Sequence, residues 1–218
     1  MGKEVKMFNN FLLLYKSIKK RGFIDTLQFV LYEYIFDIVH KTNTRGYLEL
    51  GNMNIKDNIQ NSTNYRGSNY FLLKKFFNKY DVEGKELIDF GSGKGRVLLM
   101  AMKYKAKKAI GVEFAKELIN ISEMNLATYK INNNLTTEYE LIFDDVLNYE
   151  IPESSNVLFF YNPFNELILN ELILKIKELK QDFLIVYINP VHRSIFDKSF
   201  IEIDNFNDEL LIYKGIKK

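Results

Sequence analysis

From residue 86 onward, the hydrophobic and polar positions of this chain alternate between two patterns. Apolar runs of five or six residues, most of them closed by a polar residue, predict buried strands. Between these runs, apolar residues three or four positions apart predict helices. Strands are expected at 86–90, 108–113, 138–143, 156–161 and 183–188, and helices at about 94–104, 115–129 and 166–179. This alternation is typical of an α/β domain with a parallel sheet.

The end of the chain breaks the alternation. Residues 200–204 and 209–214 are strand-like runs with only a short polar segment between them, which predicts an antiparallel hairpin. Seven strands are therefore expected in all. A dinucleotide-binding dehydrogenase would normally continue with further strand–helix units and a separate substrate domain, so the hairpin argues against that class.

The N-terminal part of the chain predicts helices. Residues 3–20 have one apolar line and an opposite side rich in lysine, which is either a solvated face or a docking surface for an acidic partner or membrane headgroups. Residues 24–40 predict a second helix with a single polar stripe. The stripe consists of Asp25, Gln28, Glu33, Asp37 and His40. Because its apolar sides need cover, we expect this helix to pack on the main domain or to line a substrate pocket.

A polar, asparagine-rich connection follows these two helices. A third helix is then expected at 71–78, with Ser68 or Asn69 as its N-cap. We divide the chain into residues 1–64, a helical cap that would recognise the substrate, and residues 65–218, the main domain. The chain of 218 residues is long enough for one such domain with a substantial core.

The first expected strand leads into a glycine-rich turn. Asp89 stands near the strand end, and glycines recur at every second position after it, at Gly91, Gly93 and Gly95. A phosphate-binding P-loop needs Ser or Thr after its Gly-Lys pair, where this chain has Gly95. A dinucleotide fingerprint needs a sixth-position glycine, where this chain has Arg96. What remains is Asp-x-Gly-x-Gly-x-Gly, which lets the backbone approach a ligand closely beside a carboxylate that can accept from an amine.

Acidic residues close the next two expected strands. Glu113 stands 24 residues after Asp89, at a strand end where a carboxylate can bind both ribose hydroxyls of a nucleoside. Asp144 and Asp145 follow the third strand, where a carboxylate can accept from an adenine amino group. The spacing does not decide between these two residues, and both could instead cap the following turn.

In this order, the motifs resemble those of the class I S-adenosylmethionine-dependent methyltransferases, over about residues 65–214. The resemblance implies a Rossmann-like, doubly wound, mostly parallel seven-stranded sheet, with S-adenosyl-L-methionine as the cofactor. It assigns the cofactor site to Asp89, Gly91, Ser92, Gly93, Gly95, Glu113, Asp144, Asp145 and Tyr65. Asp144 is favoured over Asp145 for adenine, and Tyr65 belongs to a segment that resembles the family's lid over the methionine end of the cofactor.

The fourth expected strand runs into Tyr161, Asn162, Pro163 and Phe164. This is similar to bacterial class I enzymes with Asn-Pro-Phe at the same point and, more distantly, to the non-SET lysine methyltransferases. Amino-group methyltransferases often have Asp/Asn-Pro-Pro-Tyr/Phe here, with the polar side chain accepting from the target nitrogen and the aromatic ring stacking on it. The resemblance implies that Asn162 and Tyr161 face the transferred methyl group. The single proline argues against a nucleic-acid base as the acceptor.

His192 follows the fifth expected strand on the same rim and could act as a general base, although a lone histidine is more often a structural hydrogen-bonding group. No residues with metal-ligand spacing stand out, so no metal is expected. The absence of cysteine excludes disulfides and a thiol nucleophile. The 30 basic and 28 acidic residues nearly balance, so no strong overall field attracts nucleic acid. We expect no transmembrane segment and a location in the cytoplasm.

These features together predict a methyltransferase that transfers the methyl group directly to a protein lysine or a small amine. O-methylation of a small molecule stays open as an alternative, as does a non-catalytic adaptor of the same fold. A nucleic-acid acceptor is less favoured. The identity of the methyl acceptor and the oligomeric state stay open.

Overall fold

The computed structural model describes residues 15–19, 22–48, 65–161 and 164–215, which form a seven-stranded sheet, a small ribbon and covering helices. The strands of the large sheet are β3 (Glu86–Phe90), β4 (Lys108–Glu113), β5 (Glu138–Phe143), β6 (Ser155–Tyr161), β7 (Phe183–Ile188), β8 (Ile201–Phe206) and β9 (Leu210–Gly215). The helices are α2 (Phe23–His40), α3 (Tyr70–Lys79), α4 (Arg96–Lys103), α5 (Lys116–Asn132), α6 (Glu166–Ile176) and α7 (Arg193–Asp197). The ribbon pairs β1 (Tyr47–Leu48) with β2 (Tyr65–Arg66).

The strand order of the large sheet is β5-β4-β3-β6-β7-β9-β8. The first five strands in this order are parallel, β9 runs antiparallel to β7, and β8 runs antiparallel to β9. The expected doubly wound, mostly parallel sheet with a terminal hairpin is therefore confirmed. Its chain order reverses at β3, with β4 and β5 on one side and β6 and β7 on the other. In such sheets the crevice at the carboxyl ends of the strands, at this reversal, is where ligands bind.

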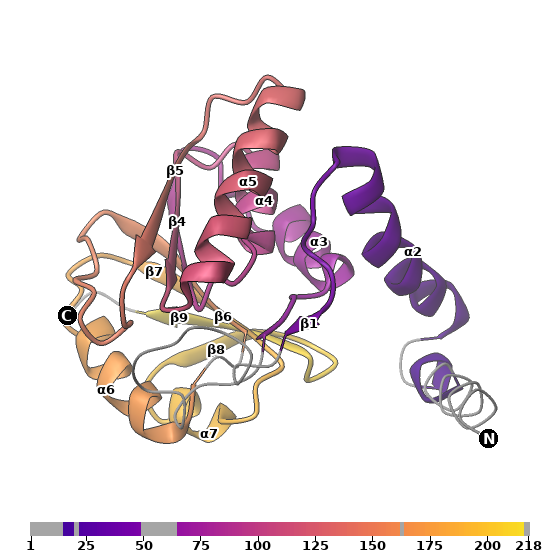
Figure 1. Ribbon diagram of the computed structural model, residues 1–218. Coiled ribbons are helices and arrows are strands. Elements are labelled where there is room, and N and C mark those ends of the chain that lie inside the picture. The colour runs from indigo at the N-terminus through magenta and orange to yellow at the C-terminus, as the bar shows by residue number, and fades with distance from the viewer. Residues whose placement is uncertain (1–14, 20–21, 49–64, 162–163, 216–218) are drawn as a thin grey trace.

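The sheet separates two hydrophobic cores, because alternate residues of a strand point to opposite faces. Leu87 of β3 belongs to the core shared with α3, α4 and α5, whereas Ile88 and Phe90 belong to the core shared with α6 and α7. Figure 1 shows α4 and α5 above the sheet and α6 and α7 below it. Asp89 lies two residues after Leu87 and therefore faces the α4 side.

Helix α2 lies against α3 and α5 rather than on the sheet (Figure 1). The Phe36 ring stacks on Tyr70, with centroids 4.0 Å apart, and lies 5.7 Å from the Tyr129 ring. Glu33 and Asp37 of the polar stripe also face the domain, through the hydrogen bonds described below.

The expectation that α2 packs on the main domain is confirmed, but only part of its apolar surface is covered. Phe36 is buried, and Phe29 and Tyr32 are half-buried against the same core. The rest of its apolar surface is exposed and consists of Phe23, Ile24, Leu27, Val30, Leu31, Tyr34, Ile35, Ile38 and Val39.

The ends of the helices agree only in part with the bounds expected from the sequence. Asn69 is the N-cap of α3, since its side chain accepts a hydrogen bond from the Phe71 N–H at 2.8 Å. Helix α4 begins only at Arg96, because Gly95 adopts a left-handed conformation, with φ +81°. The ribbon β1–β2 and the short helix α7 were not expected from the pattern. Residues 15–19 are helical, and the rest of the helix expected at 3–20 lies outside the described residues.

Among the described helices, none is both long enough and apolar enough to cross a membrane.

Candidate functional site

The glycine-rich turn after β3 folds back over the end of β4. The N–H groups of Gly91 and Ser92 donate to the Val112 carbonyl at 2.9 and 3.1 Å. Gly91, Gly93 and Gly95 all have positive φ, at 79°, 54° and 81°. A residue with a Cβ would strain the backbone at each of these positions. The sequence of alternating glycines therefore produces a tight loop whose backbone lines the carboxyl edge of the sheet.

Asp89 and Glu113 lie on the same face of two adjacent strands, directly under this loop. Both are buried, with exposed fractions of 3% and 4%. Glu113 accepts hydrogen bonds from the N–H groups of Gly93 and Ala115, each at 2.9 Å. Burial raises the pKa of Glu113. Burial, together with the negative charge of Glu113, raises the pKa of Asp89 to about 8. A cationic group of a ligand would therefore be stabilised between these carboxyls.

The loop sits so close to β4 and α5 that side chains are excluded at two glycines. A Cβ on Gly111 would lie 2.7 Å from Ser92 Oγ and 2.8 Å from Leu98 Cδ1, and one on Gly95 would lie 2.4 Å from Ser122 Oγ. Gly111 was not among the residues expected at the site, although a glycine inside a strand indicates that another part of the backbone approaches closely. The Ser92 and Ser122 hydroxyls are buried without a hydrogen-bond partner within the described part of the chain.

The two aspartates after β5 shape their own turn. Asp144 Oδ1 accepts from the Asp145 N–H at 2.7 Å and from Asn148 Nδ2 at 3.0 Å. Asp145 Oδ1 accepts from the Leu147 N–H at 2.9 Å. Each aspartate therefore makes the turn-capping contact that the sequence left open as the alternative to ligand binding.

Aromatic residues that sequence analysis missed flank the same edge. Phe143 pairs with Glu113 in the register of β4 and β5 and is 53% exposed, with Lys116 Nζ 5.0 Å from its ring centroid. Phe114, the residue after Glu113, is half-buried. An aromatic residue next to an acid at a strand end is the sequence signal that could have indicated a stacking surface.

On the other side of the crevice, β6 and β7 end together at the rim where the acceptor residues are expected. Tyr161 is half-buried and pairs with Ile188. Asn162 and Pro163 lie outside the described residues. Phe164 is buried in the core between the sheet and α6. It therefore does not stack on an acceptor in the way that the aromatic of the amino-methyltransferase motif does.

His192 lies on this rim beside a carboxylate. Its Nδ1 is 3.3 Å from Glu166 Oε1, and its backbone N–H donates to the Tyr187 hydroxyl at 3.2 Å. Burial raises the pKa of Tyr187 to about 12, so that hydroxyl stays protonated at neutral pH. The histidine thus has the carboxylate neighbour that a proton-accepting imidazole needs for a fixed orientation.

Tyr65 is described through its backbone only, which pairs with Leu48 in the ribbon β1–β2. Its side chain lies outside the description. Its expected contact with the cofactor stays a prediction.

Two side chains of the glycine-rich turn point away from the crevice and hold the N-terminal segment. Lys94 Nζ donates to the Arg45 carbonyl at 2.7 Å. Arg96 Nη1 donates to both carboxylate oxygens of Glu33, at 2.8 and 2.9 Å, and to the Ser68 carbonyl at 2.7 Å. The Arg96 guanidinium is buried and lies 4.4 Å from the Tyr70 ring centroid.

A second buried carboxylate completes this network. Asp37 accepts from the Thr44 hydroxyl at 2.7 Å, from the Thr44 N–H at 3.0 Å and from the Thr42 hydroxyl at 2.7 Å. Thr44 in turn accepts from Arg96 Nε at 3.2 Å. The polar stripe of α2 and the first residue of α4 are therefore parts of one hydrogen-bonded unit.

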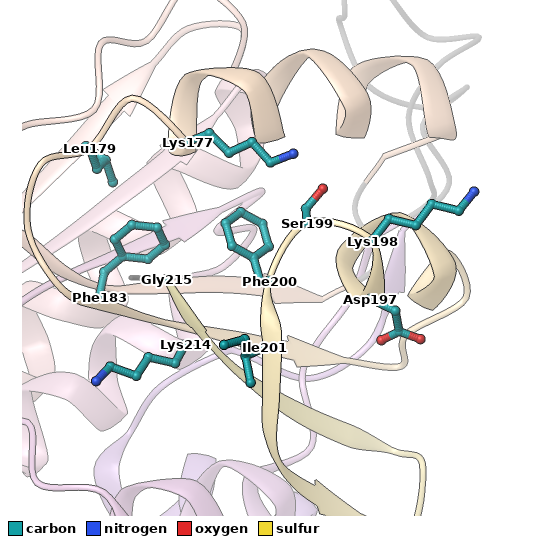
Figure 2. Close-up of a pocket in the computed structure, with 10 residues that line it drawn as sticks. All are labelled: Lys177, Leu179, Phe183, Asp197, Lys198, Ser199, Phe200, Ile201, Lys214 and Gly215. Atoms are coloured by element: carbon teal, nitrogen blue, oxygen red, sulfur yellow. The ribbon is translucent and has the colours of Figure 1, made fainter. Parts of the chain in front are cut away.

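A surface hollow of about 460 Å³ lies at the opposite edge of the sheet, near the start of β7. Figure 2 shows the residues that line it. Phe183 and Phe200 point into it. Lys198 and Lys214 point away from the hollow and from each other. The polar groups around it do not converge, so it lacks the arrangement of a binding site. In the described ranges, no three or more His, Asp or Glu residues are placed to hold a metal ion.

No protein-family model matches this chain, and no curated protein matches it. Solved structures do resemble it. A proposed RNA methyltransferase from Pyrococcus horikoshii is 22% identical, with 67% of this chain and 79% of that one covered and a TM-score of 0.50. For the proposed methyltransferase YhhF from Escherichia coli, the identity is 17%, the coverage 71% and 95%, and the TM-score 0.58.

A proposed methylase from Haemophilus influenzae is 18% identical, with 66% of this chain and 94% of that one covered and a TM-score of 0.50. At these identities the likeness is one of fold. The chain therefore has the seven-stranded fold of these proteins, with the carboxyl-edge site described above.

Proposed function

We propose that this chain is a class I S-adenosylmethionine-dependent methyltransferase. The main observation in support is that Asp89, the glycine-rich turn and Glu113 lie together at the carboxyl ends of two adjacent central strands. The fold shared with solved methyltransferase structures supports it.

The residues around the turn fit this cofactor. Glu113 has carboxylate lone pairs beyond those used by two backbone N–H groups, and these can accept both ribose hydroxyls. Asp89 can accept from the cofactor ammonium. The buried hydroxyl of Ser92 would gain a partner. The half-buried Phe114 and the exposed Phe143 would stack on the adenine ring, and Asp144 is the carboxylate we favour for its amino group, with Asp145 as the second choice.

We favour a cationic or neutral amine, such as a protein lysine side chain or a small amine, as the methyl acceptor. The rim above β6 and β7 has an exposed carboxylate, Glu166, beside His192. The nearby Arg193 is paired with Asp197, Glu202 and Asp208. Such a rim would attract a protonated amine and would repel phosphate groups.

The P. horikoshii protein is described as a proposed RNA methyltransferase. RNA is therefore the alternative methyl acceptor for this chain. It is less favoured because of the acidic rim and because only one proline follows Asn162.

The bound cofactor would supply an electrophilic methyl group on a sulfonium. A protonated amine would first give up one proton, and the nitrogen lone pair freed in this way would form the new carbon–nitrogen bond as the carbon–sulfur bond breaks. Tyr161 and Asn162 would orient the acceptor nitrogen in line with the breaking bond. His192, oriented through Nδ1 by Glu166, would receive the proton at Nε2. The chain contributes alignment, water exclusion and a proton acceptor.

Cofactor binding is tested by calorimetric titration with S-adenosylhomocysteine, S-adenosylmethionine and NADH in parallel. We expect the two adenosyl ligands to bind and NADH not to bind. Thermal unfolding should shift upward with S-adenosylhomocysteine. If neither adenosyl ligand binds, the proposal fails and a non-catalytic adaptor of the same fold is favoured.

The acceptor class is tested by transfer of tritiated methyl from S-adenosylmethionine into a host-cell lysate that is then separated into protein, nucleic acid and small molecules. Label in protein or in small amines supports the amine acceptor. Label in nucleic acid would contradict it. Label in small molecules that carry only hydroxyls would favour the O-methyltransferase alternative.

A further inference from the structure

The outward face of α2 is the largest apolar feature described on this molecule's surface. Its nine large hydrophobic side chains are between 40% and 70% exposed, with Ile24 and Ile38 near the two ends of the helix and Leu31 near its middle. Monomeric soluble proteins rarely expose an apolar patch of this size, and such patches mark interaction sites. We refer to these nine residues as the α2 face.

The α2 face cannot turn inward, because the opposite side of the helix is fixed. Glu33 and Asp37 make the buried hydrogen bonds to Arg96 and Thr44, and Phe36 stacks on Tyr70. Rotating the helix would leave the Arg96 guanidinium buried without its carboxylate, which is strongly unfavourable. The α2 face is therefore presented outward at a defined orientation, as a binding surface is.

Charge indicates what kind of surface covers it. Helix α2 has no Lys or Arg, and its charged residues are Asp25, Glu33 and Asp37. Helices that lie in a membrane interface are rich in Lys and Arg on their polar side, whereas this helix has acids there. The nine side chains of the face are uncharged, and the Arg45 guanidinium lies at its side, 5.1 Å from the Tyr34 ring centroid. Away from Tyr34, an identical face can pack against it with no like charges opposed.

The area of the α2 face also fits a second copy of this chain as the partner. Nine side chains of this kind at about half exposure present on the order of 800 Å², which is the share that each partner contributes to a standard interface. A two-fold interface uses the same patch on both partners. Two antiparallel copies of α2 would bring Leu31 next to its counterpart at the centre, with Ile24 opposite Ile38 toward each end.

We infer that the α2 face is the interface of a homodimer, in which α2 packs antiparallel against α2 of a second copy. The inference does not depend on the proposed enzymatic activity. It assigns the α2 face to the partner copy, while the opposite side of α2, with Phe36 and Glu33, stays packed on the main domain.

Sedimentation equilibrium of the full chain at micromolar concentrations tests this. We expect twice the 25.8 kDa mass of one chain. The double variant Ile24→Asp/Ile38→Asp should weaken self-association at least a hundredfold and sediment as a monomer. The control Leu174→Asp, whose side chain is 64% exposed on α6, should remain a dimer. Circular dichroism checks that both variants fold.

A second measurement uses the absence of cysteine from the chain. Leu31→Cys provides a single thiol next to the two-fold axis, so oxidation should give a disulfide-linked dimer on a non-reducing gel. Leu174→Cys is the matched control and should remain a single chain. A dimer that survives the double aspartate substitution would overturn the inference, as would a monomeric wild type.

Membrane association is a separate outcome. The wild-type chain is mixed with vesicles of phosphatidylcholine and phosphatidylglycerol and centrifuged. Binding as a monomer, lost in the double aspartate variant, would mean that lipid covers the α2 face and would refute the homodimer. A dimer that stays in the supernatant would support it.

Discussion

Asp89→Asn is expected to stabilise this protein at neutral pH while removing its ability to bind the cofactor. The wild-type carboxyl has a pKa of about 8, against an ordinary value of 3.8, because it is buried and lies near Glu113. The folded chain therefore keeps a proton that the unfolded chain releases between about pH 4 and pH 8. The free energy of unfolding of the wild type falls as the pH rises through this range.

The magnitude follows from the two pKa values. The ordinary pKa of an aspartate lies about three units below pH 7. Keeping the Asp89 carboxyl protonated in the folded chain at pH 7 therefore costs on the order of 4 kcal/mol of stability. At pH 5 the same reasoning gives about 2 kcal/mol. Asparagine has nearly the same shape and does not titrate. Its stabilising effect relative to Asp89 should therefore grow by roughly 2 kcal/mol between pH 5 and pH 7.

Urea unfolding of both proteins at pH 5 and pH 7, followed by circular dichroism, measures this difference. Titration with S-adenosylhomocysteine measures the second effect. The wild type should release a proton on binding, because the ligand ammonium favours the ionised carboxylate, and Asp89→Asn should bind at least a hundredfold more weakly. The reasoning is refuted if the two stability profiles run parallel from pH 5 to pH 7, or if the variant binds the ligand normally.

Three further predictions concern the turn and the rim. Gly93→Arg should abolish S-adenosylhomocysteine binding in calorimetry with an unchanged circular dichroism spectrum, since only backbone lines the site there. Arg96→Lys should lower the free energy of unfolding by about 3 kcal/mol in urea, because a single ammonium cannot replace a guanidinium that bonds Glu33 through Nη1 and Thr44 through Nε and Nη2. The half-buried Lys75→Met, which loses a pair with Asp25, is its control and should change it by less than about 1 kcal/mol. His192→Ala should reduce kcat about a hundredfold with cofactor affinity unchanged. Unchanged kcat would remove the histidine from the mechanism.

The sheet was largely predictable from the sequence, and the reason is physical. Strands covered by helices on both faces are largely apolar, so β7 appears as a continuous hydrophobic run and β3 as a short apolar run that carries Asp89 near its end. Their expected bounds, 86–90 and 183–188, match the structure. The terminal hairpin was predictable because two strand-like runs with a short polar segment between them leave no room for a helix. Helix ends were less well predicted. Helix α4 starts two residues late because Gly95 is in the left-handed region.

The environment of α2 was not predictable in the same way. The periodic pattern predicted one polar stripe, and a polar stripe normally faces water. In the structure Gln28 is exposed, whereas Glu33 faces Arg96, which lies 63 residues further along the chain. No local pattern encodes so distant a pairing. The contacts of Asp144 and Asp145 were likewise undecided, because the same spacing suits a turn cap and a ligand contact. The assignment of Asn162 and Tyr65 to the site stays a prediction.

The buried link between Arg96 and Glu33 has a consequence for how the chain folds. Residues 1–64 and 65–218 are separate in the sequence pattern, but the guanidinium at the start of α4 pairs with Glu33, a carboxylate of α2. Shortening the chain to the second part would leave a desolvated cation with no counter-ion in the same turn that lines the crevice. The amides of helix α2 should therefore be protected from hydrogen exchange together with those of β3 and α4. On heating, all three elements should lose this protection together. The N-terminal segment would then belong to the same cooperative unit as the turn rather than unfold independently of it.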